Sequence, residues 1–130
     1  MTFLLDTHTF LWFVEGSPRL SLYARSLIET PTNTRLVSVG SLWEMAIKCA
    51  LGKLELKMSF LELVEQEVYG NGMRLLSIEP SHLDRLVELP FHHRDPFDRL
   101  LIAQGFAERI PLVSHDSAFD AYEVERLWQK

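Results

Sequence analysis

Residues 95–116 read DPFDRLLIAQGFAERIPLVSHD, in which a helix pattern runs directly into a strand pattern. Asp95 suits a helix N-cap, and Pro96 suits the first helical position because proline lacks the N–H that would be unpaired there. The apolar face expected on this helix comprises Leu100, Ile102, Ala103, Phe106 and Ala107. The stretch predicts a helix over 95–110 and a short strand over 111–116, which together form half of a β–α–β unit.

The same alternation of short apolar runs and helical patterns continues through the rest of the chain. Further strands are expected at 2–6, 35–39 and 73–78, with an edge strand at 124–128, and further helices at 7–16, 20–30, 42–52, 59–72 and 80–89. Strands that alternate with helices favour a parallel sheet covered on both faces. The sequence therefore predicts one α/β domain over residues 1–130, with three α/β/α layers and a short central parallel sheet of four to five strands.

Composition narrows the class of protein. The 130 residues carry a net charge of -5, which disfavours a module that binds nucleic acid through basic side chains alone. The charge is compatible with an enzyme whose carboxylates hold a divalent cation. Cys49 is the single cysteine, so no disulfide framework is expected. No run is long and apolar enough to span a membrane and the start lacks a signal-peptide pattern, so we expect a cytoplasmic protein with no membrane partner.

Two acids follow predicted strands. Asp6 ends the first apolar run and Asp116 ends the run at 111–116. Parallel strands bring their carboxyl ends to one edge of the sheet, where α/β proteins bind ligands, so we expect the two side chains on the same rim. Each has a second interpretation as a helix N-cap, with Thr7 an alternative cap to Asp6, and the local pattern leaves both interpretations open.

Two further acids are expected near helix starts. Ser41 and Glu44 fit a capping box, with Ser41 at the N-cap and Glu44 at the third helical position. Asp98 holds the third position after Asp95, where the helix dipole favours a carboxylate by roughly 0.3 to 1 kcal/mol. A structural role is therefore open for Glu44 and Asp98. Four crowded carboxylates would nevertheless repel one another without a cation, and oxygen ligands favour Mg²⁺ or Mn²⁺.

Four blocks of sequence together resemble the PIN-domain ribonucleases, in particular toxins of the VapC type from type II toxin–antitoxin modules. The blocks are LLDTHTFLW, SVGSLWEMAIKCALGKLEL, HHRDPFDRLLIAQ and LVSHDSAFDAY, and they span nearly the whole chain. The resemblance implies a PIN fold and metal-dependent endoribonuclease activity with Mg²⁺ or Mn²⁺. It assigns catalysis and metal binding to Asp6, Glu44, Asp98 and Asp116, and treats Asp95 as the N-cap or at most a support of the ligands. Gly105 departs from the alanine common in the family.

The resemblance also indicates candidates for substrate and partner binding. Thr7 matches a small hydroxyl residue that many relatives place near the metal or phosphate. Ser38 and Ser41 are candidates for the same contact, although capping is the better interpretation for Ser41. The candidates for phosphate contacts are Arg94, Arg99 and His115, with His92 and His93 close by; the alternative is a solvated loop. The family implies an RNA substrate, a small antitoxin partner and a homodimer. An aromatic cluster on the first two helices is either core or part of a partner groove, and it comprises Trp12, Phe13, Leu20 and Tyr23.

Two other functions compete with this interpretation. A phosphotransferase or phosphatase of the haloacid dehalogenase type would need a second acid two residues after Asp6, and His8 stands there. A non-catalytic PIN-like domain that binds nucleic acid or a protein is the second alternative. The presence of all four acids argues against this binding module.

Overall fold

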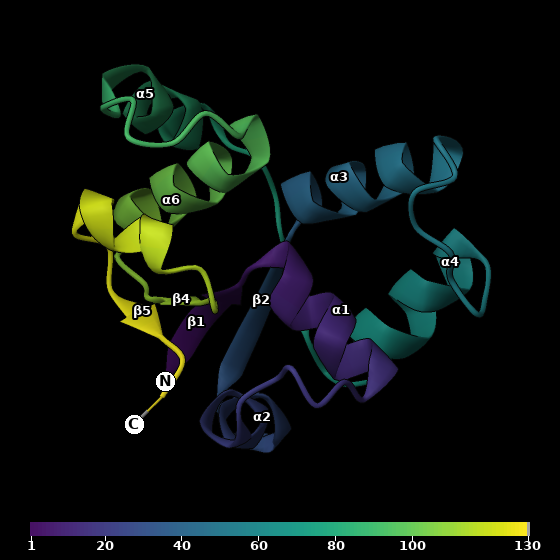
Figure 1. The fold of residues 1–130 in the computed structure, drawn as a ribbon. Coiled ribbons are helices and arrows are strands. Elements are labelled where there is room, and N and C mark those ends of the chain that lie inside the picture. Colours follow the sequence, from purple (N-terminus) through teal and green to yellow (C-terminus); the bar gives the residue numbers. More distant parts are fainter. Residues whose placement is uncertain (130) are drawn as a thin grey trace.

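The computed structural model describes residues 1–129 and has a five-stranded parallel sheet at its centre (Figure 1). The strands are β1 Thr2–Leu5, β2 Thr34–Ser38, β3 Arg74–Leu76, β4 Leu112–Val113 and β5 Arg126–Leu127. Their order across the sheet is β3-β2-β1-β4-β5, and every pairing is parallel. The predicted parallel sheet is confirmed, with the last strand at one edge.

The register of the central strand aligns the ends of its two neighbours. Leu5 in β1 pairs with Val37 in β2 and with Val113 in β4. The next residue of each segment therefore lies at the same carboxyl edge of the sheet. Those residues are Asp6, Ser38 and Ser114.

Helical segments connect the strands. They are α1 Thr7–Glu15, α2 Leu22–Glu29, α3 Val39–Ala50, α4 Phe60–Leu63, the π-helix η1 Val64–Tyr69, α5 Pro80–Glu88, α6 Pro96–Glu108 and the 3₁₀ helix η2 Ser117–Tyr122. The helix expected over 59–72 thus begins as α4 and continues as a π-helix. Within the described residues no helix combines the length and apolar character that a membrane crossing requires.

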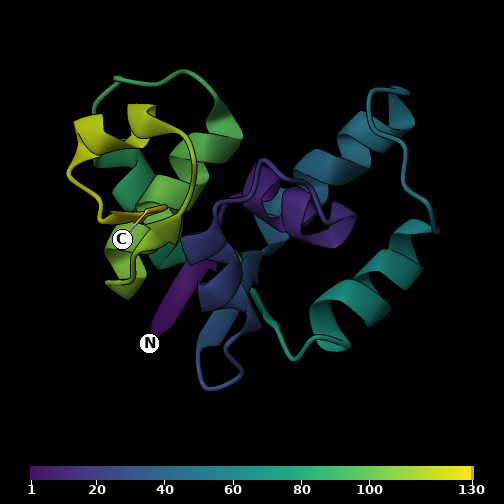
Figure 2. The ribbon, with the colours of Figure 1, turned by 60° about the horizontal axis from the view of Figure 1, so that its bottom comes forward.

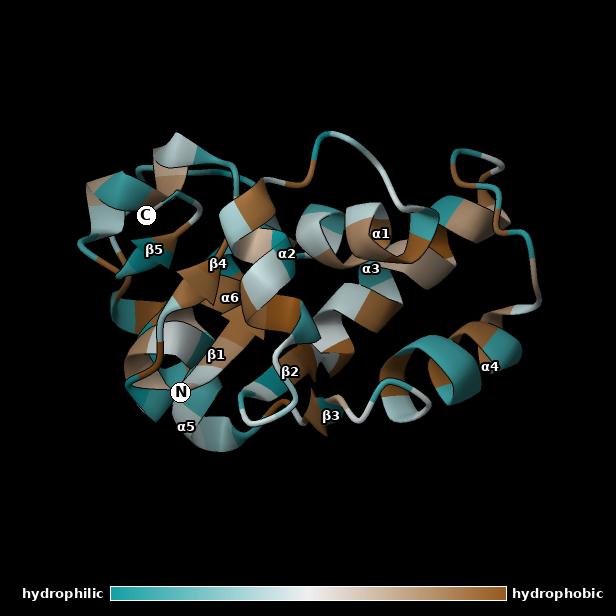
Figure 3. Ribbon diagram, turned by 90° about the horizontal axis from the view of Figure 1, so that it is seen from below, coloured by the Kyte–Doolittle hydropathy of each residue, from teal (hydrophilic) through white to brown (hydrophobic). Residues whose placement is uncertain are grey.

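The core is divided between the two faces of the sheet, because successive side chains of β1 point to opposite sides. Phe3 and Leu5 pack in a cluster with α1, α2, α3 and the α4–η1 segment. Leu4 packs in a second cluster with α6, the end of α5 and η2. Figures 1 and 2 show these groups of helices on either side of the strands, and Figure 3 shows the strands between them as largely hydrophobic. The three-layer α/β/α arrangement is confirmed.

Helix α6 begins as predicted but is buried more completely than a one-sided pattern indicates. Asp95 is its N-cap, and its carboxylate accepts hydrogen bonds from the backbone N–H groups of Phe97 and Asp98. Residues 99–105 are all buried, because the helix packs against the sheet, α3 and α5 together. A side-chain carbon at Gly105 would lie 3.3 Å from Ile110 O and from the Leu112 and Val124 side chains. The departure at position 105 therefore permits close packing.

The predicted start of α3 is wrong. The helix begins at Val39 directly after β2, and Ser38 caps it by accepting a hydrogen bond from the Gly40 N–H at 3.0 Å. Ser41 and Glu44 lie inside the helix, so they do not form a capping box. A side-chain carbon at Gly40 would lie 2.5 Å from Leu100 Cδ2, so the glycine permits α3 to approach α6 closely. This contact brings the starts of the two acid-bearing helices together.

Candidate metal centre

Asp6 serves as a helix cap and as a buried member of the site at once. Its Oδ1 accepts a hydrogen bond from the Thr9 backbone N–H at 3.1 Å, which caps α1. Its Oδ2 accepts one from the Ser114 hydroxyl at 2.6 Å, at the end of β4. Burial raises the pKa of Asp6, against the opposing hydrogen bonds from Ser114 and Thr9. The two interpretations that the sequence left open are therefore compatible.

Asp98 occupies the third position of α6, as predicted, and its carboxylate is half-buried. Burial, followed by the negative charges of Asp95, Asp6, Glu44 and Asp116, raises its pKa to about 7. Like charges at short range disfavour the ionised form of a carboxyl group. The other three predicted acids therefore all lie close enough to act electrostatically on Asp98, which means that the four acids converge.

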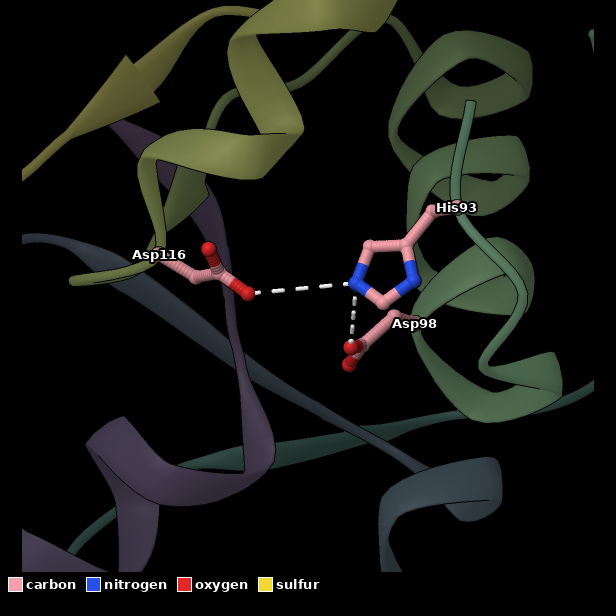
Figure 4. Close-up of side chains that lie close together, drawn as sticks. All are labelled: His93, Asp98 and Asp116. Atoms are coloured by element: carbon pink, nitrogen blue, oxygen red, sulfur yellow. Dashed lines mark ion pairs between the residues drawn. The ribbon is translucent and has the colours of Figure 1, made fainter. Parts of the chain in front are cut away.

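Asp116 approaches Asp98 through His93, a residue in the loop before α6. His93 Nε2 lies 3.1 Å from Asp98 Oδ2 and 3.8 Å from Asp116 Oδ2. Figure 4 shows the three side chains pointing toward one another from the loop, from α6 and from the segment after β4. One ligand atom from each residue falls within a group whose members are all within 4.8 Å of one another. Asp116 also caps η2 by accepting the Ala118 N–H at 2.9 Å.

The ring of His93 is held in one tautomer by its own loop. The Asp95 backbone N–H donates to His93 Nδ1 at 3.2 Å, so in the neutral ring the proton is on Nε2. That proton is directed to the Asp98 carboxylate. The His93 backbone N–H in turn donates to the Tyr122 hydroxyl at 2.7 Å, which attaches the loop to η2. In this geometry His93 orients Asp98.

Glu44 reaches the site from the sixth position of α3 rather than the third. The Thr7 hydroxyl donates to Glu44 Oε1 at 2.8 Å, and the Ser41 hydroxyl oxygen lies 2.9 Å from that of Thr7. Lys48, one turn further along α3, donates from Nζ to Glu44 Oε2 at 2.8 Å. Both oxygens of Glu44 are thus fixed in position by neighbours within the fold.

The predicted substrate residues fall into different places. Thr7 and Ser38 are buried, so neither hydroxyl faces an open surface. The Thr7 hydroxyl donates to Glu44, and the Ser38 hydroxyl caps α3. Arg94 is exposed beside His93. His115 is exposed next to Asp116.

The position of Arg99 corrects its assignment as a phosphate contact. Its side chain is buried, and its guanidinium donates to the carbonyl of Pro90 at 2.8 Å and to that of Leu89 at 3.1 Å. The guanidinium also lies 4.0 Å from the centre of the Phe91 ring. Arg99 therefore fixes the loop that carries His93. Adjacent helical residues point about 100° apart, which directs Arg99 away from the side chain of Asp98.

Sequence reasoning missed Ser114, Lys48 and the geometry of His93. Lys48 had a visible signal, since an acid and a lysine four residues apart on a helix are neighbours. Ser114 follows β4 as Asp6 follows β1, so the rule that strand ends share one edge could have identified it. His93 stands next to His92, and only the folded loop distinguishes the two. His92 contacts Tyr122, with ring centres 5.1 Å apart.

The donor set fits a divalent cation of the Mg²⁺ or Mn²⁺ type. The group of possible ligand atoms within 4.8 Å of one another belongs to His93, Asp98 and Asp116, and Asp6 lines one cavity together with Asp116. Carboxylate oxygens are hard ligands that suit hard cations. Burial is the largest cause of the raised pKa of Asp98, and the negative charges of the neighbouring acids add to it. A cation among them would offset these charges. Cys49 is a free thiol on α3 and does not belong to the metal-ligand cluster found in the described residues.

The aromatic cluster expected on the first two helices belongs mainly to the core. Leu20 is buried, and Trp12, Phe13 and Tyr23 are partly buried against the same cluster. Exposed apolar side chains instead recur every fourth residue along α3 and its C-cap, at Trp43, Ile47 and Leu51, and on α5, at Leu83 and Val87.

Comparison with known proteins identifies the relatives of this chain. The family model for the PIN domain matches residues 3–125. Among curated proteins, no match is found. The solved structure of VapBC2 from Rickettsia felis, bound to a DNA fragment from their promoter, superposes with a TM-score of 0.75 at 16% identity, covering 99% of this chain and 100% of that one.

Two further solved structures have the same fold. FitAcB from Neisseria gonorrhoeae superposes with a TM-score of 0.64 at 15% identity, covering 96% of both chains. A toxin–antitoxin complex from Klebsiella pneumoniae gives a TM-score of 0.58 at 16% identity, covering 88% of this chain and 86% of that one.

Proposed function

The chain belongs to the PIN-domain family, and from this premise we propose that it is a metal-dependent endoribonuclease that hydrolyses RNA phosphodiester bonds. The observation that carries the proposal is the convergence of Asp6, Glu44, Asp98 and Asp116 at the carboxyl edge of the sheet. Burial, together with the negative charges of Asp95 and of the other three acids, raises the pKa of Asp98 to about 7, and a cation in the site would offset this crowding of charge.

Three carboxylates in this proposal would hold Mg²⁺ or Mn²⁺: Asp6, Asp98 and Asp116. When bound, the cation would supply positive charge against the phosphodiester and would lower the pKa of a nearby water molecule. Glu44 stands beside them with both oxygens fixed by Thr7 and Lys48, so it can accept a proton or a hydrogen bond in one defined orientation.

The surrounding residues position these carboxylates. Ser114 donates to Asp6 and His93 donates to Asp98, so each of the two acids is oriented by a donor from another segment. Such outer contacts fix the orientation of ligands and tune their affinity for metal. Arg94 is the exposed basic residue next to His93 and is the remaining arginine candidate for a phosphate contact in this loop.

A toxin of a type II toxin–antitoxin module is the biological role that we propose. The support is that the solved structures with the same fold include VapBC2 and a toxin–antitoxin complex. In this proposal the chain binds a small antitoxin and forms a homodimer. Affinity purification of the tagged protein from its native host, with identification of any small protein that co-purifies, tests the antitoxin, and light scattering of the purified chain tests the homodimer.

Cleavage of RNA by the purified protein tests the activity. We expect cleavage of single-stranded RNA with Mg²⁺ or Mn²⁺, and its loss with a chelator. Asp98→Asn should abolish cleavage, whereas Asp84→Asn, the same change at an exposed site on α5, should leave it unchanged.

Two results would contradict the proposal. Equal cleavage by wild type and Asp98→Asn would show that the acids do not carry the reaction. Metal-independent binding of intact RNA by the wild type, without cleavage, would favour the non-catalytic binding module instead.

A further inference from the structure

A cavity next to the acids has a wall that the proposed hydrolysis does not use. Its volume is about 360 Å³, and it is lined by Asp6, His8, Trp12, Arg19, His115, Asp116 and Ser117. The two acids belong to the candidate metal centre. The other five residues come from α1, from the segment that follows it, from the segment after β4 and from the start of η2.

Three rings form a compact group at this wall. The Trp12 ring centre lies 5.9 Å from that of His115 and 6.0 Å from that of Trp128, and the centres of His115 and Trp128 are 5.4 Å apart. Each of these pairs meets edge to face, at 71°, 62° and 78° respectively. The three rings are therefore not stacked in parallel on one another, and the His8 ring centre lies 5.9 Å from that of Trp12.

Exposure differs across the group. Trp128 is 8% exposed and belongs to the core, and its carbonyl accepts a hydrogen bond from Ser21. Trp12 is partly buried against the same core, whereas His115 is exposed. Trp128 is thus buried behind Trp12 and His115, and these two rings line the cavity. A purely structural cluster would have no need of an exposed member beside the acids.

Positive charge accompanies the rings although the protein as a whole is acidic. The Arg19 guanidinium lies 6.0 Å from the centre of the Trp12 ring. In residues 1–129 no carboxylate forms an ion pair with Arg19. Arg126, at the adjoining hollow lined by His115 and Trp128, is held by Asp120 through two hydrogen bonds of 2.8 and 3.0 Å. Arg19 is thus available for an anionic ligand.

We propose that Trp12 and His115 form a stacking subsite for an unstacked base of single-stranded RNA, one nucleotide away from the scissile phosphate, with Arg19 contacting the adjoining backbone. This subsite rests on the proposed ribonuclease function, because a cation held by Asp6 and Asp116 would bind the scissile phosphate in the same cavity. Aromatic rings flanked by cationic groups recognise single-stranded nucleic acid by stacking and charge. A base in a duplex has no free face, so the subsite selects unpaired RNA.

The chemistry of the cavity favours a nucleotide over a peptide. A peptide would need an aromatic side chain for the rings and a separate acidic side chain, in the right order, for Arg19 and for a cation held by Asp6 and Asp116. A single nucleotide supplies a planar base for Trp12 and His115 together with an anionic phosphate for Arg19 and a bound cation.

A binding experiment with a single missing base tests the subsite. The probes are an eight-nucleotide oligouridine and a set of the same length with one abasic position each, in Ca²⁺ buffer, with the RNA checked for intactness on a gel. For the wild type, we expect one abasic position to weaken binding about tenfold, which is within the range for stacking one base on an aromatic side chain.

The variants decide whether that base contacts the proposed rings. His115→Ala should weaken binding of the complete oligonucleotide about tenfold and remove the penalty of the critical abasic position. Trp12→Phe keeps an apolar ring in the core and should reduce the penalty only in part. Tyr69→Ala removes an exposed aromatic ring on η1, which contacts β3 at the opposite edge of the sheet, and should change neither value.

An abasic penalty that is equal in wild type and His115→Ala, or absent from both, would overturn the subsite. Cleavage by the wild type is measured in parallel with Mn²⁺, so that a failed subsite with intact cleavage is distinguished from a failed ribonuclease function. Loss of a co-purified protein partner in His115→Ala, with RNA binding unchanged, would assign the cavity to protein recognition and also overturn the proposal.

Discussion

The starts of α1 and α6 use carboxylates in different ways. At α1, the single carboxylate of Asp6 caps the helix through Thr9 and also accepts the Ser114 hydroxyl in the site. At α6, Asp95 caps the helix and Asp98 belongs to the site. The difference follows from the connection, because β1 leads directly into α1 whereas a loop leads into α6. A cap that directly follows a central strand already lies at the carboxyl edge and can do both tasks.

The largest effect should come from separating the two tasks of Asp6. Asparagine caps helices about as well as aspartate, so Asp6→Asn should keep the fold but lose cleavage to below detection. Asp6→Ala should lose cleavage and also about 1 kcal/mol of stability, because the Thr9 N–H loses its acceptor. RNA cleavage and urea unfolding of both variants measure these outcomes. Cleavage retained in Asp6→Asn would leave Asp6 with the cap alone.

A smaller effect should come from the donors that orient the two acids. Ser114→Ala and His93→Ala should each reduce metal affinity and cleavage by about 10- to 100-fold, as is typical when an outer contact to a metal ligand is lost. Titration calorimetry with Mn²⁺ measures the affinity. His93→Gln retains a donor near the position of Nε2 and should recover part of the loss; no recovery at all would favour direct coordination by the imidazole.

The pH dependence of stability should reveal the raised pKa of Asp98. Since the folded-state pKa of Asp98 is about 7 and its ordinary value is 3.8, the folded protein binds this proton more tightly than the unfolded chain. The resulting stability is fully present below about pH 4 and is lost as the pH rises toward 7. Without metal, the unfolding temperature of the wild type should therefore fall more between pH 5 and pH 8 than the unfolding temperature of Asp98→Asn.

Addition of Mn²⁺ provides the control for this pH effect. A bound cation favours the ionised carboxylates, so it should raise the unfolding temperature of the wild type more at pH 8 than at pH 5. Asp84→Asn should behave as the wild type does. If wild type and Asp98→Asn show the same pH profile, then crowding of the acids does not act on Asp98.

The smallest effect should be confined to the cap of α6. Asp95→Ala removes the acceptor of two backbone N–H groups and should lower the free energy of unfolding by about 1 kcal/mol, whereas Asp95→Asn should be nearly neutral. Asp98→Ala removes no cap and should not show this loss. Urea unfolding of the three variants measures the difference. A larger loss in Asp98→Ala than in Asp95→Ala would reverse the division of tasks.

Local patterns were sufficient where one segment contains the whole signal. Asp95 followed by Pro96 fixed the start of α6, and Asp98 then had to lie one turn inside the helix. The same reasoning failed at α3, where Ser41 and Glu44 match a capping box that the chain does not use. Ser38 caps instead, because β2 ends there and the helix starts at the next residue. A capping pattern inside a helix is indistinguishable from a real one until the end of the strand is known.

The sequence by itself determined the alternation of strands and helices and the carboxyl-edge position of Asp6, because hydrophobic period and chain direction are local properties. The pattern predicts Asp116 at the end of a strand over 111–116, but β4 ends at Val113 and Ser114 occupies that edge. Only the tertiary structure decided which groups touch. It directed Arg99 to the loop carbonyls, His93 to Asp98 and Ser114 to Asp6, and it placed Trp12 beside His115. These contacts join segments far apart in the chain or depend on the path of a loop, so they are set by how the layers pack around the sheet.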